Sequence, residues 1–142
     1  MFRAFWLAGV LLIIAACSPS ATPPATSSAE NLASQPAVAH ILTIDEFADI
    51  MANQSAVYTV VNVHIPYEGE IEGTDMKIAY NDVNALTAAL PDKDTPIILY
   101  CRSGNMSAQA TRVLVELGYS QIYDVPGGMI AWESSGRPIV DR

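Results

Sequence analysis

The chain has 142 residues, of which 51% are apolar, and a formal charge of −8 at pH 7. This length fits one folded domain, and the composition is typical of a globular core rather than of a disordered chain. The negative charge argues against a nucleic-acid partner and against electrostatic attachment to anionic lipid, because both need a basic face. Two cysteines are too few for a disulfide scaffold.

The chain begins with an apolar run from Ala4 to Ala16, preceded by Arg3. The run is too short to span a membrane comfortably, but it suits a secretory signal, which we predict over residues 1–16. It ends in the sequence IAAC, which resembles the lipobox of bacterial lipoproteins. This resemblance implies cleavage before Cys17 and a lipid on its sulfur. An ordinary signal peptide or a short anchor with a chance cysteine is the alternative.

Residues 17–39 follow as a segment rich in Ser, Thr, Pro and Ala. Such a segment buries too little apolar surface to order itself, so we predict a flexible tether. We therefore expect a domain over residues 40–142 that is held at the cell envelope by acylated Cys17. The site of attachment would be the outer membrane, facing the periplasm, if the bacterium is Gram-negative.

Strand-like and helical patterns alternate through residues 40–142. Thr43 and Glu46 have the spacing of a capping box, which predicts a helix that ends near Ala52. Further along the chain we predict a strand over 57–64, a loop over 65–75, a short strand over 77–80, a helix capped by Asn81 or Asp82 and ending at Leu90, a strand over 97–100, a helix from about Gly104 to Gly118, a strand over 121–125 and a short helix ending at Trp132. This alternation predicts parallel strands with helices on both faces of the sheet.

The helix that ends at Gly118 should bury one side against the core. Its apolar residues spaced by three or four are Ala110, Val113, Leu114 and Leu117. Near the end of the chain, Met129 and Trp132 are also expected in the core.

Cys101 directly follows the predicted strand over 97–100, where open parallel sheets bind their ligands. The short loop after it contains Gly104 and Asn105, which tolerate unusual backbone angles, so successive N–H groups can converge on one point. The following helix adds its positive end, which favours an anion by roughly 0.3–1 kcal/mol, and up to about 2 kcal/mol when partly buried. The loop is therefore predicted to hold a thiolate, a persulfide or an oxyanion, although a buried structural cysteine is the alternative.

Two motifs together resemble the rhodanese-like superfamily. CRSGNMS (residues 101–107) resembles its active-site loop, and VPGGMIAW (residues 125–132) resembles its closing segment. The resemblance implies an α/β domain with a central, mostly parallel five-stranded sheet and helices on both faces. It also implies that Cys101 receives a sulfane sulfur as a persulfide and passes it to a thiol or another acceptor, without a cofactor. The substrate-binding residues that it implies are Arg102, Ser103, Gly104, Asn105, Met106 and Ser107.

Some positions depart from the family pattern. The predicted loop over residues 65–75, called the first loop from here on, follows Asn62-Val63-His64, where many members have Asp-x-Arg. Its residues 69–74 (GEIEGT) occupy the place where many members have Gly-His-Ile-Pro-Gly-Ala. Met106 stands where many members have arginine. Two functions remain open: a sulfurtransferase that uses a small donor and a thiol acceptor, or a catalytically weak binding or sensing module. Redox chemistry through a mixed disulfide with a partner is a third option. A phosphatase is disfavoured, because its loop would need an arginine at the position of Ser107.

Other polar residues lie near the predicted site. Asn62 and His64 end a predicted strand. His64 either acts in the site as a base or hydrogen-bond donor, or it is a surface histidine whose hydrogen bonds are already satisfied. The three carboxylates of the first loop are expected to form a solvated face, and no spacing there demands a metal ion. These carboxylates belong to Glu68, Glu70 and Glu72.

Overall fold

The computed structural model describes residues 38–141. The predicted signal segment, Cys17 and most of the predicted tether lie outside these residues. Within the described part, no helix has the length and apolar character needed to cross a membrane.

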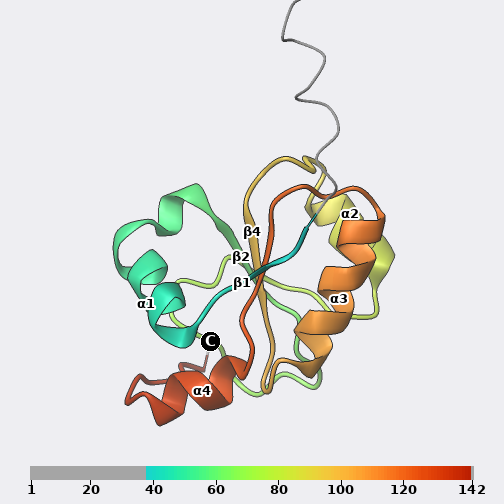
Figure 1. Cartoon of the computed structure of the whole chain (residues 1–142). Helices are drawn as coiled ribbons and strands as arrows, with labels where there is room; N and C mark the ends of the chain where they lie inside the picture. Colours follow the sequence, from blue (N-terminus) through green and yellow to red (C-terminus); the bar gives the residue numbers. More distant parts are fainter. Residues whose placement is uncertain (1–37, 142) are drawn as a thin grey trace, which may run out of the picture. The chain divides into compact units, whose positions relative to one another are not determined.

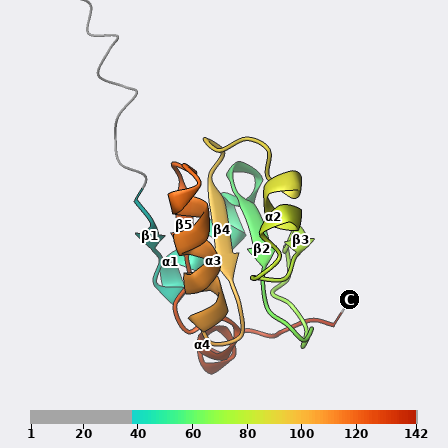
Figure 2. The same cartoon turned by 90° about the vertical axis from the view of Figure 1, so that its right-hand side faces the viewer.

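A five-stranded sheet forms the centre of the domain. Its strands are β1 (His40–Ile41), β2 (Thr59–Asn62), β3 (Met76–Lys77), β4 (Ile97–Tyr100) and β5 (Ile122–Asp124), in the spatial order β1-β5-β4-β2-β3. Every pair of neighbouring strands is parallel. The strands point toward the end of the domain where the last helix lies (Figure 2). The predicted α/β fold with a parallel five-stranded sheet is thus confirmed.

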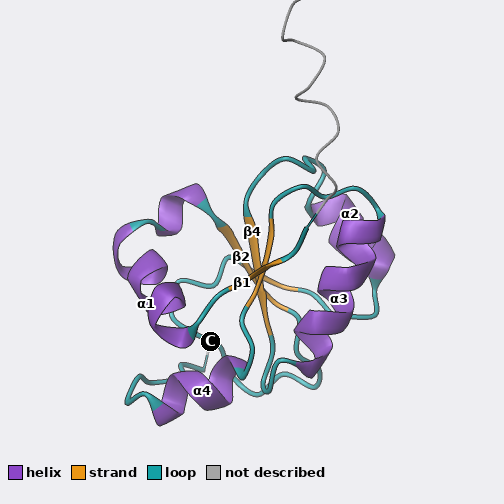
Figure 3. Ribbon diagram, in the orientation of Figure 1, coloured by secondary structure: helices purple, strands orange, loops and turns teal. Residues whose placement is uncertain are grey.

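Four helices cover the two faces of this sheet. They are α1 (Ile44–Asn53), α2 (Val83–Ala89), α3 (Asn105–Glu116) and α4 (Gly128–Ser134), with one 3₁₀ turn over Ser55–Val57. Helices α1 and α4 lie on one face and α2 and α3 on the other (Figures 1 and 3). Each pair encloses its own apolar core, because the buried strands present apolar side chains on both faces.

Local sequence signals explain where the helices begin and end. The Thr43 hydroxyl caps α1, and the Glu46 carboxylate accepts the backbone N–H of Thr43, so the capping box is present as predicted. Asp82 caps α2 through the N–H of Ala85. Gly118 follows α3 with a φ of 88°, which glycine adopts without strain.

Two sequence predictions about burial and strand length are wrong. Leu117 is 41% exposed, because α3 ends at Glu116 and the chain turns away at Leu117. The polar residues Ser107 and Thr111 occupy the buried side of α3 instead, together with Ala110 and Leu114. The strand predicted over residues 57–64 spans only 59–62, because the 3₁₀ turn precedes it and the chain leaves the sheet before His64.

Tyr100 anchors the first loop to the centre of the sheet. Its hydroxyl accepts the N–H of Ile71 at 3.0 Å and lies 2.6 Å from the hydroxyl of Thr74. Since the Thr74 hydroxyl donates to the Ile71 carbonyl, Tyr100 donates to Thr74. Burial raises the pKa of Tyr100 to about 12, so the phenol stays protonated and keeps both contacts.

Replacing Tyr100 by phenylalanine should destabilise the domain by about 1–3 kcal/mol, because it leaves the buried N–H of Ile71 without its acceptor. Urea denaturation of the wild-type and Tyr100→Phe proteins measures this difference. Tyr80→Phe serves as the control, since Tyr80 is only partly buried. Equal stability of wild type and Tyr100→Phe would show that the hydroxyl does not anchor the loop.

Candidate functional site

Cys101 lies at the carboxyl edge of the sheet, directly after β4. Asn62 of β2 pairs with Tyr100 of β4, so the residues after each strand run side by side at this edge. Cys101 is a free thiol and is 1% exposed, in contact with the core between the sheet and α3. The strand order therefore places one buried sulfur where parallel sheets bind their ligands.

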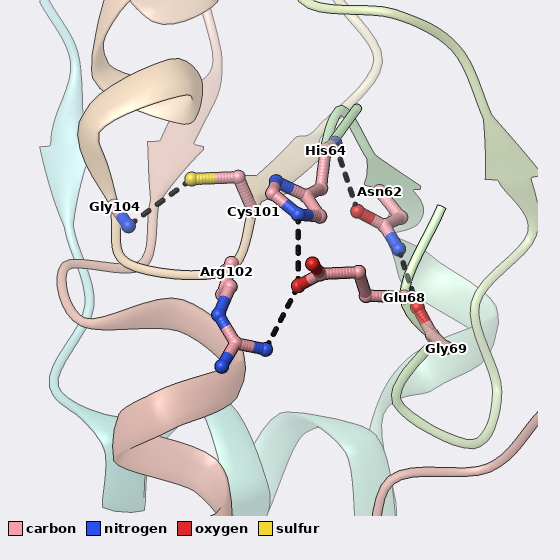
Figure 4. A network of polar contacts seen from close by, with 7 residues as sticks. All are labelled: Asn62, His64, Glu68, Gly69, Cys101, Arg102 and Gly104. Carbon is pink, nitrogen blue, oxygen red and sulfur yellow. Dashed lines mark hydrogen bonds and ion pairs between the residues drawn. The ribbon is translucent and has the colours of Figure 1, made fainter. Parts of the chain in front are cut away.

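Gly104 supplies the hydrogen bond to this sulfur. Its backbone N–H donates to Cys101 Sγ at 3.1 Å (Figure 4). A φ of 90° at Gly104 makes this tight loop possible, because residues with a Cβ rarely adopt that angle. Helix α3 begins at the next residue, and the N–H groups of its first turn have no carbonyl partner inside the helix. The loop thus places backbone donors and the positive end of a helix close to the thiol.

The other residues of the predicted substrate loop differ in exposure. Arg102, Ser103 and Asn105 are exposed, Met106 packs against the core, and Ser107 is buried. Arg102 is turned toward the first loop, where its guanidinium lies 2.8 Å from Glu68 Oε2. The cationic side chain next to the thiol is therefore already paired with a carboxylate.

The start of α4 holds residues 101–107, called the active loop from here on, in place through its backbone. The N–H of Met129 donates to the carbonyl of Cys101 at 2.9 Å, and the N–H of Ile130 donates to that of Arg102 at 3.0 Å. Gly128 has a φ of 48°, and a Cβ there would overlap the Cys101 carbonyl oxygen. Gly128 of the closing segment therefore permits a close approach of two backbones.

The first loop brings a cluster of polar side chains to the side of Cys101 that lies opposite Gly104 (Figure 4). His64 Nε2 lies 3.3 Å from Glu68 Oε2, the same oxygen that contacts Arg102. Asn62 fixes this arrangement, since it accepts the N–H of His64 at 3.0 Å and donates to the carbonyl of Gly69 at 3.1 Å. Asn62 and His64 are thus brought to the site as the sequence predicted.

The expected solvated face of glutamates is only partly present. Glu70 is buried and lies 3.7 Å from the ammonium group of Lys77, because the loop pairs with Val140 and turns inward there. His64 is not a satisfied surface residue either, since its side chain is 9% exposed and its Nδ1 has no hydrogen-bond partner. Among residues 38–141, no three His, Cys, Asp or Glu side chains group in a way that could hold a metal ion.

Asp124 is a buried carboxyl behind the active loop that the sequence analysis did not identify. The Ser107 hydroxyl, which donates to the carbonyl of Gly104 at 3.1 Å, also interacts with Asp124. Burial raises the pKa of Asp124, while Ser107, the N–H of Val125 and the charge of Arg112 act in the opposite direction. One carboxyl oxygen is buried without a hydrogen-bond partner. The signal in the sequence was a lone aspartate that ends an apolar strand.

Asp124→Asn should stabilise the domain near neutral pH. The wild-type carboxyl is buried and therefore harder to ionise in the folded state than in the unfolded state, and the uncharged amide does not carry this cost. A raised folded-state pKa means that wild-type stability falls as pH rises above the unfolded-state value of about 3.9. The variant should lack this fall. Urea denaturation near pH 3 and near pH 7 tests it. Parallel pH dependence of both proteins would contradict the assignment, and Asp141→Asn is an exposed control.

Comparison with known proteins gives a consistent result. The family model of the rhodanese-like domain matches residues 28–135. A sulfurtransferase of Allochromatium vinosum is 46% identical over 48 residues, which cover 34% of this chain and 45% of that protein. The thiosulfate sulfurtransferase GlpE of Pseudomonas fluorescens is 32% identical over 91 residues, which cover 63% of this chain and 82% of the relative. The first of these matches thus spans less than half of the relative's length.

Solved structures agree with the fold. The crystal structure of a rhodanese-related protein from Thermoplasma volcanium has a TM-score of 0.59 at 28% identity and covers 71% of this chain and 97% of the other. A rhodanese-like domain from Anabaena sp., solved by NMR, has a TM-score of 0.63 at 19% identity, covers 77% of this chain and 81% of the other, and supports the fold alone.

Proposed function

The chain belongs to the rhodanese-like domain family, and on that premise we propose that it is a sulfurtransferase which carries a sulfane sulfur as a persulfide on Cys101. Relatives are named sulfurtransferase and thiosulfate sulfurtransferase. The observation that carries the proposal is the contact between the Gly104 N–H and Cys101 Sγ at the carboxyl edge of the sheet. A donor hydrogen bond to sulfur stabilises the thiolate, which is the form that attacks.

The proposed reaction has two displacements at sulfur. With thiosulfate as donor, the Cys101 thiolate attacks the outer sulfur, a new S–S bond forms, and the S–S bond of thiosulfate breaks with its electron pair leaving on sulfite. An acceptor thiolate then attacks the outer sulfur of the persulfide, and the Cys101 thiolate leaves. The acceptor ends as a persulfide, and the enzyme is restored without a cofactor.

The backbone around Cys101 provides the electrostatic part of this chemistry. The Cys101 thiolate is both nucleophile and leaving group, so an N–H that stays fixed on its sulfur helps both steps. The hydrogen bonds from α4 to the loop carbonyls hold that N–H in position. The remaining loop residues, Arg102 to Ser107, would surround the bound donor.

A binding or sensing module is the second candidate. Three features favour it: Cys101 is 1% exposed, Met106 stands where many family members have arginine, and Arg102 is already paired with Glu68. Under this alternative the domain would bind a partner without turning over a sulfur donor.

A turnover assay separates the two candidates. Purified protein is given thiosulfate and cyanide, or a small-molecule persulfide and a thiol, and the formation of thiocyanate or of the new persulfide is followed over time. The proposal predicts multiple turnovers that saturate with donor concentration. Rates equal to those of protein-free buffer with every donor would favour the binding module.

We also propose that Cys17 is acylated and holds the domain at the cell envelope. Support comes from the sequence alone, where IAAC ends an apolar run of signal length. Cells fed an alkyne-tagged fatty acid should label the wild-type protein, and Cys17→Ser should lose the label and leave the membrane fraction. Equal labelling of Cys17→Ser would contradict the proposal, and Cys101→Ser is the matched control that should still be labelled.

A further inference from the structure

His64, Glu68 and Arg102 form a connected polar group beside Cys101 (Figure 4). The Glu68 carboxylate lies 3.3 Å from His64 Nε2 and 2.8 Å from the Arg102 guanidinium. An ionised carboxylate accepts hydrogen bonds and cannot donate them, so Nε2 is the nitrogen that carries the proton. In the neutral ring the lone pair therefore belongs to Nδ1.

His64 Nδ1 has no partner of its own. It is buried without a hydrogen bond among residues 38–141, in a side chain that is 9% exposed. In Figure 4 this nitrogen is on the side of the ring that faces Cys101, while Nε2 faces Glu68. A buried acceptor left unpaired costs about 1–3 kcal/mol, so its retention calls for an explanation.

The backbone around His64 is held firmly. Residue 62 pairs with residue 100 across the sheet, so His64 follows β2 at the level where the active loop follows β4. Asn62, which is itself buried, accepts the backbone N–H of His64 and donates to the carbonyl of Gly69. Both the histidine and the loop that carries Glu68 are thus tied to the same strand end.

A cavity of about 300 Å³ also opens beside the histidine. It is lined by His64, Ile65, Tyr67, Lys77, Ile78 and Ala79. Its volume is at the lower end of the range that binds small organic molecules. It therefore offers room for a small thiol next to His64.

We propose that His64 is the base that removes the proton from an incoming thiol acceptor, and that Glu68 is the positioning residue that holds the imidazole with Nδ1 free. This inference rests on the proposed function and concerns its second half. The thiol gives its proton to Nδ1, and the resulting thiolate attacks the outer sulfur of the Cys101 persulfide. The enzyme S–S bond breaks, its electron pair stays on Cys101 Sγ, the acceptor becomes a persulfide, and His64 returns the proton to the released thiolate or to solvent.

The acceptor class for which such a base is useful is a small organic thiol. A thiol with a pKa of about 8.5 is mostly protonated at neutral pH and reacts only as the thiolate. A positioned base typically accelerates such a step by about 10²- to 10⁴-fold. Sulfite in mildly alkaline solution carries no proton to remove, so the base should not help it.

Single-turnover kinetics test this role. The protein is first loaded with sulfur by a donor and separated from it, and the persulfide is quantified by mass spectrometry. It is then mixed with β-mercaptoethanol or with sulfite, and the loss of persulfide is followed from about pH 6 to about pH 9. In mildly alkaline solution of about pH 7.5, where most of the sulfite carries no proton but the thiol is still protonated, His64→Ala should slow the thiol reaction about 10²-fold and leave the sulfite reaction within about twofold. The difference should shrink toward pH 9 as the free thiol ionises.

The loading step separates the failure of this inference from failure of the proposed function. If wild type forms no persulfide, the proposed function is wrong. If His64→Ala loads normally but reacts with thiol and sulfite in the wild-type ratio, His64 is not the base. His40→Ala, which removes the other histidine of the chain, should behave as wild type.

The positioning role of Glu68 has its own readout. The groups that face His64 are Glu68, Arg102 and Cys101, with Lys77 on the same cavity. Glu68→Ala removes the hydrogen-bond acceptor of the Nε2–H, so the thiol reaction should slow while the sulfite reaction stays within about twofold of wild type. Glu68→Gln keeps an oxygen that can accept from Nε2 and should restore most of the thiol rate, and Glu116→Ala at the far end of α3 should leave both rates unchanged. A wild-type ratio of thiol to sulfite rates in Glu68→Ala would show that the carboxylate does not position the histidine.

Discussion

Cys101→Ser should abolish sulfur transfer, with a loss of at least about 10³-fold in kcat/KM, because no other group in the proposed site can carry the persulfide. A serine hydroxyl is protonated at neutral pH and forms no stable bond to sulfane sulfur. The substitution keeps the size of the side chain and lets the Gly104 N–H find an oxygen acceptor, so the fold should remain. Steady-state transfer from thiosulfate to cyanide, and from a persulfide to a thiol, measures the effect.

The matched control is the same substitution at the other cysteine. Cys17→Ser should retain full transfer activity in detergent, since residue 17 lies outside the predicted domain. Denaturation curves of Cys101→Ser and wild type should agree within about 1 kcal/mol. Equal turnover by Cys101→Ser and wild type would remove the sulfurtransferase proposal and leave the binding module.

Gly128→Ala should be the most damaging single-methyl change near the site, with a cost of about 2–4 kcal/mol and a loss of transfer activity of at least about tenfold. The left-handed backbone at residue 128 costs an alanine about 1–2 kcal/mol. The added methyl group also overlaps the Cys101 carbonyl, so the hydrogen bonds from Met129 and Ile130 to the loop must lengthen or break. The loop that holds Gly104 against the sulfur then loses its support.

Gly136→Ala is the control that shows the cost of a left-handed backbone without the steric overlap that Gly128→Ala also creates. Residue 136 has a φ of 84°, but a methyl group there would meet nothing within 4 Å. It should therefore cost only about 1–2 kcal/mol and leave transfer activity near wild type. Urea denaturation and steady-state transfer are measured on both variants. If the two variants lose stability and activity equally, the contact between the closing segment and the active loop has no special role.

Much of the fold follows from short-range patterns. The capping box of Thr43, the cap at Asp82 and the glycine after α3 are local signals, and each is realised where the sequence predicts it. Parallel pairing follows from the alternation of strands and helices, since antiparallel hairpins would need short turns. Leu117 was misassigned because apolar spacing continues past the point where the helix ends.

The sequence predicts only part of the candidate site. Cys101 and Gly104 lie in one short loop, and their spacing reveals that they act together. The meeting of Glu68 with His64 and Arg102 depends on how the first loop folds across two strand ends, and no local pattern encodes that path. The burial of Asp124 depends on α3 packing over the end of β5, which is equally non-local.

The central claim is that the sulfur of Cys101 takes up one sulfane sulfur and gives it away. The most direct measurement treats the protein with a sulfur donor, blocks persulfides by alkylation, digests the protein and weighs the peptide that contains residue 101. We predict one added sulfur atom on that peptide and its disappearance when a thiol is added before alkylation. An unmodified peptide after treatment with both thiosulfate and a small-molecule persulfide would contradict the account.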